Sequence, residues 1–308
     1  MTEVRLALNA MATRFEVVLH GDNESRLRGA GEAALAEVES LEARLSLYRP
    51  PSEIARVNML AAREPVRVSP QVFQLLQQAR RLQMETGGAF DITVAPLVRC
   101  WGFMRNAGRV PEPAEIAEAR SLVGMEHVIL DPQNCSVRFD RDGMMMDLGA
   151  IGKGHAIDCA AEILREAGVD GALLHGGTST IYGIGSPPSA EGWKIAIGPV
   201  PGHPAPQFTV VLRDSALSVS AVWGRCFEAG GRKYGHVIDP RTGWPVNNAI
   251  QSAVVLPSAT ESDALSTALL VTGLEGHDAI YRLRPEMRSM VMAPAEDAFR
   301  VKSKGIAV

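Results

Sequence analysis

The sequence lacks any long apolar run. No stretch approaches the roughly 18 apolar residues that a membrane-spanning helix needs, so we expect no membrane span. Residues 1–21 alternate apolar and polar side chains, and they contain neither the basic segment nor the continuous apolar segment of a secretory signal. No lipobox is seen either. We therefore expect a cytoplasmic protein, although the mature form of an exported protein would look the same.

Aromatic residues and clustered basic residues are also scarce. Aromatic side chains make up 5% of the chain, and the 31 Lys and Arg residues are scattered in a chain of net charge -4. Duplex-binding proteins need a clustered basic face, and single-strand binders stack bases on aromatic side chains. Nucleic acid is therefore not an expected partner.

The few cysteines indicate no disulfide framework. Cys100, Cys135, Cys159 and Cys226 form no C-x-x-C pair. A chain of 308 residues can stabilise itself through its core and needs no disulfides. We expect four free thiols.

What is present is the composition of a globular protein, with 46% hydrophobic and 21% charged residues. No repeat, low-complexity tract or composition break marks a linker. Apolar periodicity predicts a succession of helices and strands. Helices are expected over 25–46, in a short segment after Pro51, over 70–85, 113–123 and 153–168, and from 258 onward; residues 100–115 read as a loop. Strands are expected over 3–9, 14–20, 127–131, 135–139, 144–148, most of 171–257, 288–292 and 298–302. The pattern favours one intertwined α+β domain over residues 1–308.

A glycine-rich turn follows the predicted strand that ends near Asp147. It reads Asp147-Leu148-Gly149-Ala150-Ile151-Gly152-Lys153-Gly154 and leads into a predicted helix. Backbone N–H groups at a helix N-terminus and the charge of Lys153 favour an anion such as a phosphate. The spacing is neither that of a P-loop nor that of G-x-G-x-x-G. A purely structural strand–turn–helix also explains this run taken alone.

A second pattern lies at the start of the last predicted helix. Ser258 to Glu261 fits a capping box, and Asp263 and Thr267 follow four residues apart on one helix face. A carboxylate and a hydroxyl so placed are hard oxygen ligands of the kind that Mg²⁺ takes. The alternative is an exposed acidic first turn that complements the helix dipole, with the Thr hydroxyl bonded back to its own helix.

Three more runs combine glycines with polar side chains. Tyr234 to Gly243 places His236 beside a turn that carries Asp239, so His236 is a candidate acid–base group or phosphate donor, or else a satisfied strand-end His. Thr86 to Thr93 offers a glycine loop to a nucleotide, or forms a helix C-cap. His175 to Thr178 allows close approach of a ligand to the backbone, or forms a tight turn.

Taken in order, these runs resemble the FAD:protein FMN transferase (ApbE) family over roughly residues 8–275. The matching runs are Met11-Ala12-Thr13, similar to M-G-T; Ser46 to Ile54 with Asn58, similar to a Y-x-P-x-S-E loop; Ala89-Phe90-Asp91, similar to the loop that contacts FAD; Asp147 to Asp158, similar to D-L-G-G-I-A-K-G-Y-A-V-D; His236 to Gly243, similar to H-I-I-D-P-R-T-G; and Asp263 to Ala268, similar to D-A-L-A-T-A.

The resemblance implies a single α+β domain related to the T-fold. It implies an enzyme that binds FAD and Mg²⁺, splits the pyrophosphate, attaches FMN to a Thr or Ser of a target flavoprotein and releases AMP. By matching position, Asp263, Thr267 and the backbone carbonyl of Ala150 would hold the metal, and His236 would act at the phosphates or on the attacking hydroxyl. The FAD site would be lined by Met11, Tyr48, Ala89, Phe90, Asp91, Asp147, Lys153 and Val237.

This chain departs from the family pattern in a few positions. Thr178 stands where the family's N-x-G-G-D run has its acid, and Ser218 to Trp223 replaces S-T-S-G-x-Y. Gly152 and His155 stand where Ala and Tyr are common. Two alternatives stay open: a pyrophosphatase that converts FAD to FMN and AMP, and a non-catalytic flavin-binding protein.

Overall fold

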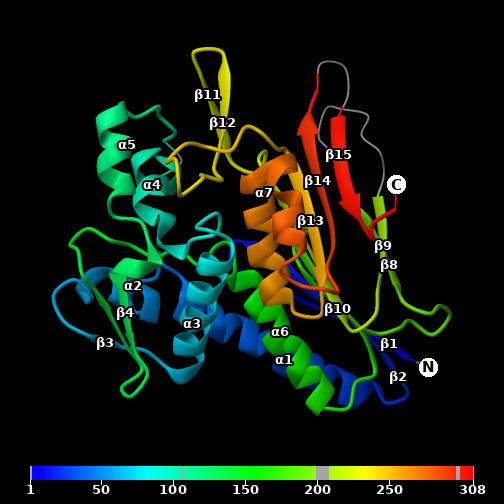
Figure 1. Ribbon diagram of the computed structural model, residues 1–308. Helices are drawn as coiled ribbons and strands as arrows, with labels where there is room; N and C mark the ends of the chain where they lie inside the picture. Colours follow the sequence, from blue (N-terminus) through cyan, green and yellow to red (C-terminus); the bar gives the residue numbers. More distant parts are fainter. Residues whose placement is uncertain (1, 106, 199–207, 296–298, 308) are drawn as a thin grey trace.

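The computed structural model describes residues 2–105, 107–198, 208–295 and 299–307. Its centre is an eight-stranded sheet in the order β1-β2-β6-β7-β10-β13-β14-β15, and all neighbouring strands pair antiparallel (Figure 1). The strands are β1 (Thr2–Ala10), β2 (Thr13–Gly21), β6 (Gly171–Gly176), β7 (Thr180–Gly185), β10 (Ser215–Ala221), β13 (Gln251–Leu256), β14 (Arg288–Pro294) and β15 (Phe299–Lys304).

Three smaller sheets and seven α-helices complete the part of the fold that is described. The smaller sheets are β3-β5-β4, β8-β9 and β11-β12, with bounds β3 (Val66–Arg67), β4 (Val128–Asp131), β5 (Ser136–Phe139), β8 (Trp193–Ile197), β9 (Phe208–Leu212), β11 (Cys226–Ala229) and β12 (Arg232–Gly235). The helices are α1 (Glu24–Leu45), α2 (Glu53–Leu60), α3 (Pro70–Glu85), α4 (Ala95–Cys100), α5 (Pro113–Arg120), α6 (Gly152–Glu166) and α7 (Ala259–Tyr281), with 3₁₀ turns at Ile92–Val94, Phe103–Arg105 and Met125–His127.

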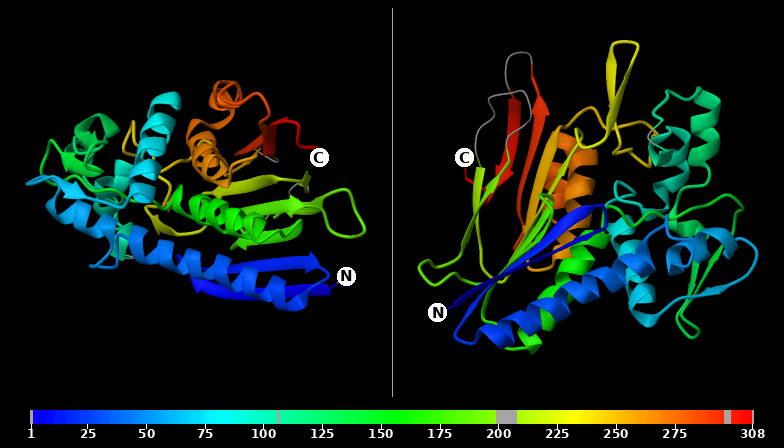
Figure 2. Two further views of the ribbon diagram at one scale, coloured as in Figure 1. Left: turned by 90° about the horizontal axis from the view of Figure 1, so that it is seen from below. Right: turned by 180° about the vertical axis from the view of Figure 1, so that it is seen from behind.

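The middle of the central sheet is buried on both faces, as strand β13 shows most clearly because all six of its residues are buried. Val254 and Leu256 belong to the main hydrophobic core, together with apolar residues of α1, α6 and α7. Their neighbours Ala253 and Val255 belong to a second core, which the hairpin β8–β9 supplies. Successive side chains of a strand point to opposite faces, so the helices cover one face and β8–β9 the other (Figure 2).

These elements confirm the expected α+β class and most of the expected helices and strands. The expectation of a single domain over residues 1–308 stays a prediction. Residues 199–207, within the stretch expected to be mostly β, and residue 298, the first of the last expected strand, lie outside the described residues. The four cysteines carry free thiols, as expected.

The strand expected over 144–148 is wrong. Met144, Met146 and Leu148 are buried in alternation, which produced the strand-like pattern. The backbone of Met146 bonds instead to a side chain: Asn58 Nδ2 donates to its carbonyl at 2.9 Å, and its N–H donates to Asn58 Oδ1 at 2.7 Å. The N–H of Asp147 donates to the carbonyl of Ile92 at 2.7 Å. An Asn amide therefore replaces a neighbouring strand, and the segment is extended without joining a sheet.

Residues 100–115, read from the sequence as a loop, also contain short helical elements. The end of α4, the 3₁₀ turn at Phe103–Arg105 and the start of α5 fall within this stretch. Trp101 there is fully buried, and its indole N–H donates to the Gly243 carbonyl at 2.9 Å. Among the described residues, none of the helices combines the length and the apolar character that crossing a membrane requires.

Candidate active site

A cavity of about 900 Å³ lies where the glycine-rich turn, the loops of the N-terminal half and the ends of the sheet strands meet. Its walls come from the β1–β2 turn, the segment after α1, the loop before α4, the turn before α6, strand β10, the segments flanking the β11–β12 hairpin, and α7. The structure brings every candidate site residue to this cavity: Met11, Tyr48, Ala89, Phe90, Asp91, Asp147, Ala150, Lys153, His236, Val237, Asp263 and Thr267.

The β1–β2 turn places Met11 at the cavity in a strained conformation. Met11 and Ala12 have φ of 50° and 58°, in the left-handed region that side chains other than Gly disfavour. A two-residue hairpin turn of type I′ needs positive φ at both positions. The Met11 N–H donates to Glu42 Oε1 at 2.8 Å, and Arg49 donates to Glu42 Oε2 at 2.5 Å. These contacts offset strain at a site-lining turn.

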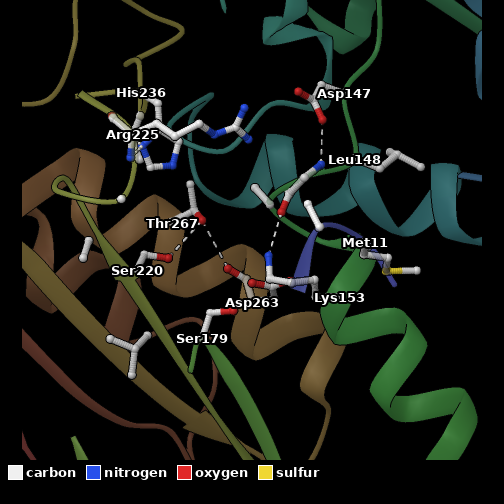
Figure 3. A pocket seen from close by; sticks show the side chains of 18 of the residues that line it. Met11, Asp147, Leu148, Lys153, Ser179, Ser220, Arg225, His236, Asp263 and Thr267 are labelled. Carbon is white, nitrogen blue, oxygen red and sulfur yellow. Dashed lines mark hydrogen bonds between the residues drawn. The ribbon is translucent and has the colours of Figure 1, made fainter. Parts of the chain in front are cut away.

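The turn before α6 keeps the N-terminus of that helix open to the cavity. Asp147 Oδ1 accepts from the Gly149 N–H at 2.8 Å, and the Gly152 N–H donates to the Leu148 carbonyl at 2.7 Å. The Lys153 ammonium donates to the Gly149 carbonyl at 3.1 Å (Figure 3). The first turn of α6 contains no acidic residue. The helix N-terminus and the Lys153 ammonium therefore both bring positive charge to the cavity wall, which favours an anion.

Asp147 faces this positive end of the cavity. Burial raises the pKa of its carboxyl group, while the Gly149 N–H and the charges of Arg225 and Lys153 act in the opposite direction. The carboxyl group is thus positioned by the turn itself, next to two cationic side chains.

Asp263 is buried, so the expectation of an exposed first-turn acid is wrong. Only 4% of the residue is exposed, and its Oδ2 accepts from the backbone N–H of Gly154 at 3.0 Å. The reason is the close packing of α6 against α7. The Asp158 carboxylate caps α7 by accepting from the hydroxyl groups of Ser258 and Thr260 and from the N–H groups of Ala259 and Thr260. One helix thus fixes the start of the other.

The capping box expected at Ser258 forms only in part. The Ser258 hydroxyl accepts from the Glu261 N–H at 3.2 Å, as a cap should. The Glu261 carboxylate instead pairs with Arg284 and Arg81 at 2.7 and 2.5 Å. Those two ion pairs compete successfully with the reciprocal bond to the cap.

Thr267 lies one turn further along α7 and faces the cavity (Figure 3). Its hydroxyl donates to the Asp263 carbonyl at 3.3 Å, so the back-bonded alternative is present as well. Ser220 Oγ on β10 lies 3.2 Å from the Thr267 hydroxyl and 2.8 Å from that of Ser266. The motifs of the sequence do not single out Ser220, which belongs to the run Ser218 to Trp223 that departs from the family pattern.

Asp91 is held by its own loop. Its Oδ1 accepts from the N–H of Thr93 at 2.8 Å and from the Thr93 hydroxyl at 2.6 Å. Burial raises the pKa of the Asp91 carboxyl group, and the bonds to Thr93 partly offset this. The neighbouring Ala89 and Phe90 are each 1% exposed. This loop shapes the cavity wall through its backbone and packing.

His236 lies directly after the β11–β12 hairpin and is hydrogen-bonded to the backbone of Arg225. The backbone N–H of His236 donates to the Arg225 carbonyl at 2.9 Å. In the tautomer that carries its proton on Nδ1, the ring donates to the same carbonyl at 3.2 Å, and Nε2 keeps its lone pair. Burial lowers the pKa of the imidazole, and the charges of Arg225 and Lys153 lower it further. His236 is therefore neutral at neutral pH.

Arg225 also lines the cavity, and sequence reasoning did not find it. A single Arg in a Gly-containing segment belongs to no motif, so no signal in the sequence set it apart.

The oxygen atoms near α7 suit a hard cation. Among the described residues there is no group of three or more His, Cys, Asp or Glu side chains that could hold a metal ion. Asp263, Thr267 and the Ala150 carbonyl instead offer one carboxylate, one hydroxyl and one backbone oxygen beside the same cavity. Mg²⁺ is usually bound by one or two carboxylates together with substrate phosphates and water, so this donor set fits it.

Comparison with known proteins gives consistent results. The model of the ApbE family matches residues 11–291. The chain is 32% identical to an FAD:protein FMN transferase of Vibrio cholerae over 85% of this chain and 79% of the relative. It is 30% identical to one of Klebsiella pneumoniae over 84% of this chain and 81% of the relative. A crystal structure of the ApbE protein of Thermotoga maritima superposes with a TM-score of 0.88 at 25% identity, covering 99% of this chain and 97% of that one.

Proposed function

Because the chain belongs to the ApbE family, we propose that it is an FAD:protein FMN transferase that uses Mg²⁺ and acts on a target flavoprotein. The observation that carries the proposal is the convergence on one cavity of all the residues that the family resemblance assigns to FAD, metal and catalysis. The cavity volume of about 900 Å³ falls within the usual range for small-molecule sites, roughly 300–1,000 Å³.

The metal ligands would be Asp263, Thr267 and the carbonyl of Ala150. When bound, Mg²⁺ supplies positive charge to the non-bridging oxygens of the pyrophosphate. The N-terminus of α6 and Lys153 also attract phosphate oxygens, through backbone N–H donors and positive charge. The remaining work of the protein is to position the reactants, as is usual in phosphoryl transfer.

His236 is the group suited to the proton transfer. Its neutral Nε2 would accept the proton of the acceptor Thr or Ser hydroxyl as that oxygen bonds to the FMN phosphorus. The bond between this phosphorus and the bridging oxygen breaks, and AMP leaves with the electron pair. Flavin is thereby attached through a phosphoester, and no oxidant or reductant is consumed.

The proposal is tested by incubating the protein with FAD, with and without Mg²⁺, and measuring AMP. AMP release that requires both Mg²⁺ and an acceptor flavoprotein supports the transferase. AMP and free FMN formed without any acceptor would instead identify a pyrophosphatase, with water in place of the hydroxyl. Bound FAD that stays intact under all conditions would indicate a flavin-binding protein and contradict the proposal.

Catalysis by His236 predicts a particular pH dependence. Because its pKa is lowered from 6.5, the imidazole stays neutral, and able to act as a base, at pH values where an ordinary His is protonated. We expect kcat/KM to fall with decreasing pH only below 6.5. His236→Gln should lower the rate by roughly 10²- to 10⁴-fold and remove this acid limb. An unchanged limb in His236→Gln would show that another group is responsible.

A further inference from the structure

The three cationic side chains that line the cavity differ in how they are bound. Arg49 is paired with Glu42 at 2.5 Å, so its charge is largely neutralised. Lys153 donates to the Gly149 carbonyl at 3.1 Å. The guanidinium of Arg225 has neither a hydrogen bond nor an ion pair with any of the described residues. It is therefore the cation of this cavity with the greatest unused donor capacity.

The backbone of Arg225 contacts the His236 ring, whereas its guanidinium makes no hydrogen bond with any described residue. It lies between β10 and β11, directly before the hairpin, and its carbonyl and N–H both face the His236 ring, at 3.2 and 3.4 Å from Nδ1. Figure 3 shows its side chain extending from the His236 wall into the cavity toward Asp147, with Lys153 and Asp263 on other walls. The contact between the Arg225 backbone and the His236 ring therefore fixes both the position of the imidazole and the point from which the Arg225 side chain extends.

We propose that Arg225 is a phosphate-binding residue of this site, which grips the FAD pyrophosphate from the His236 wall. The inference rests on the proposed function, since it assumes that FAD occupies the cavity. A guanidinium presents several N–H donors in a planar fork that matches two oxygens of a phosphate. No competing carboxylate has to be released before the phosphate binds. The residue would also neutralise charge on the non-bridging oxygens of the phosphate that it holds.

The alternative is that Arg225 is an exposed hairpin residue with no ligand. The two alternatives predict different changes in flavin affinity when Arg225 is replaced. If Arg225 binds phosphate, its replacement weakens the binding of FAD and leaves the binding of riboflavin, which has no phosphate, unchanged. If Arg225 only shapes the cavity or supports His236, its replacement changes the binding of both flavins by the same factor.

The test compares Arg225→Gln and Arg225→Lys with the wild type by quenching of flavin fluorescence, using FAD and riboflavin as separate ligands. Arg232→Gln is the matched control, because Arg232 is an exposed residue of the same hairpin and does not line the cavity. We expect Arg225→Gln to weaken FAD binding roughly 10- to 100-fold, the range of charge-assisted hydrogen bonds. Riboflavin binding should be unchanged, and Arg225→Lys should restore part of the FAD affinity.

Salt provides a second measurement on the same proteins. The FAD affinity of the wild type should fall more steeply with ionic strength than that of Arg225→Gln, because one charge contact is gone. Equal FAD affinities in Arg225→Gln and Arg232→Gln, or equal losses for FAD and riboflavin, would overturn the inference. If the wild type binds FAD in these titrations and releases AMP in the assay with Mg²⁺ and an acceptor, only the role of Arg225 is refuted. If the wild type binds no FAD, the proposed function fails as well.

Discussion

Replacement of Asp263 by Asn is expected to abolish metal-dependent AMP release while leaving the protein folded. Asp263 is 4% exposed, and its Oδ2 accepts the Gly154 N–H at 3.0 Å. An Asn side chain has the same shape and can accept that bond through its amide oxygen. It removes the negative charge, which is the strongest attraction that the site offers to a divalent cation. We expect AMP release to fall by roughly 10²-fold or more.

Asp263→Asn is preferable to Asp263→Ala because the site is buried. Ala would leave the Gly154 N–H without its partner, at a cost of about 1–3 kcal/mol, and would mix loss of stability with loss of metal. The measurements are the melting temperature, and AMP release as a function of Mg²⁺ concentration. A variant that melts like the wild type and has full activity at limiting Mg²⁺ would show that Asp263 is not a metal ligand.

Gly154→Ala is expected to damage both stability and activity. A Cβ atom at this position would lie 2.3 Å from the Ala259 carbonyl oxygen and 2.8 Å from Asp263 Cβ. The first of these is backbone, which cannot rotate away, so α6 and α7 would have to separate. Overpacking of this kind costs about 1–3 kcal/mol. The separation would also move Asp263 and Thr267, which both lie on α7, away from Ala150, and the concentration of Mg²⁺ needed for half-maximal rate should rise.

Gly29→Ala is the control for this substitution. Gly29 is also within a helix, α1, and an added Cβ there would meet nothing within 4 Å. Its stability should be unchanged or higher by up to about 1 kcal/mol, because Ala favours a helix more than Gly does. Thermal unfolding and Mg²⁺ titration of both variants test the prediction. A Gly154→Ala protein with wild-type stability and metal requirement would mean that the two helices are not in the contact described.

The sequence predicts the fold well where periodicity is carried by long elements. The strands near residues 3–9 and 14–20 and the helix over 25–46 are found within a residue or two. It fails at 144–148, because alternating burial there is satisfied by the Asn58 amide and not by a strand. A side chain distant in the sequence that replaces a ladder partner leaves no local pattern.

The site is predicted only in part, for a related reason. Motifs identified the polar residues of the turns, and the structure brings these together around one cavity. Their roles as ligands of FAD and metal stay predictions, as does the cytoplasmic location. Burial of Asp263 depends on the contact between α6 and α7, and the reach of Arg225 depends on the hairpin foot. Neither the burial of Asp263 nor the reach of Arg225 can be inferred from the spacing of residues that are close in the sequence.

The most direct test of the account is the intact mass of an acceptor flavoprotein after incubation with this protein, FAD and Mg²⁺. The account predicts that the acceptor gains the mass of one FMN less one water per modified Thr or Ser and that one AMP is released for each attachment. Asp263→Asn should produce neither. An acceptor of unchanged mass, while AMP and free FMN accumulate with the wild type, would contradict the transferase assignment.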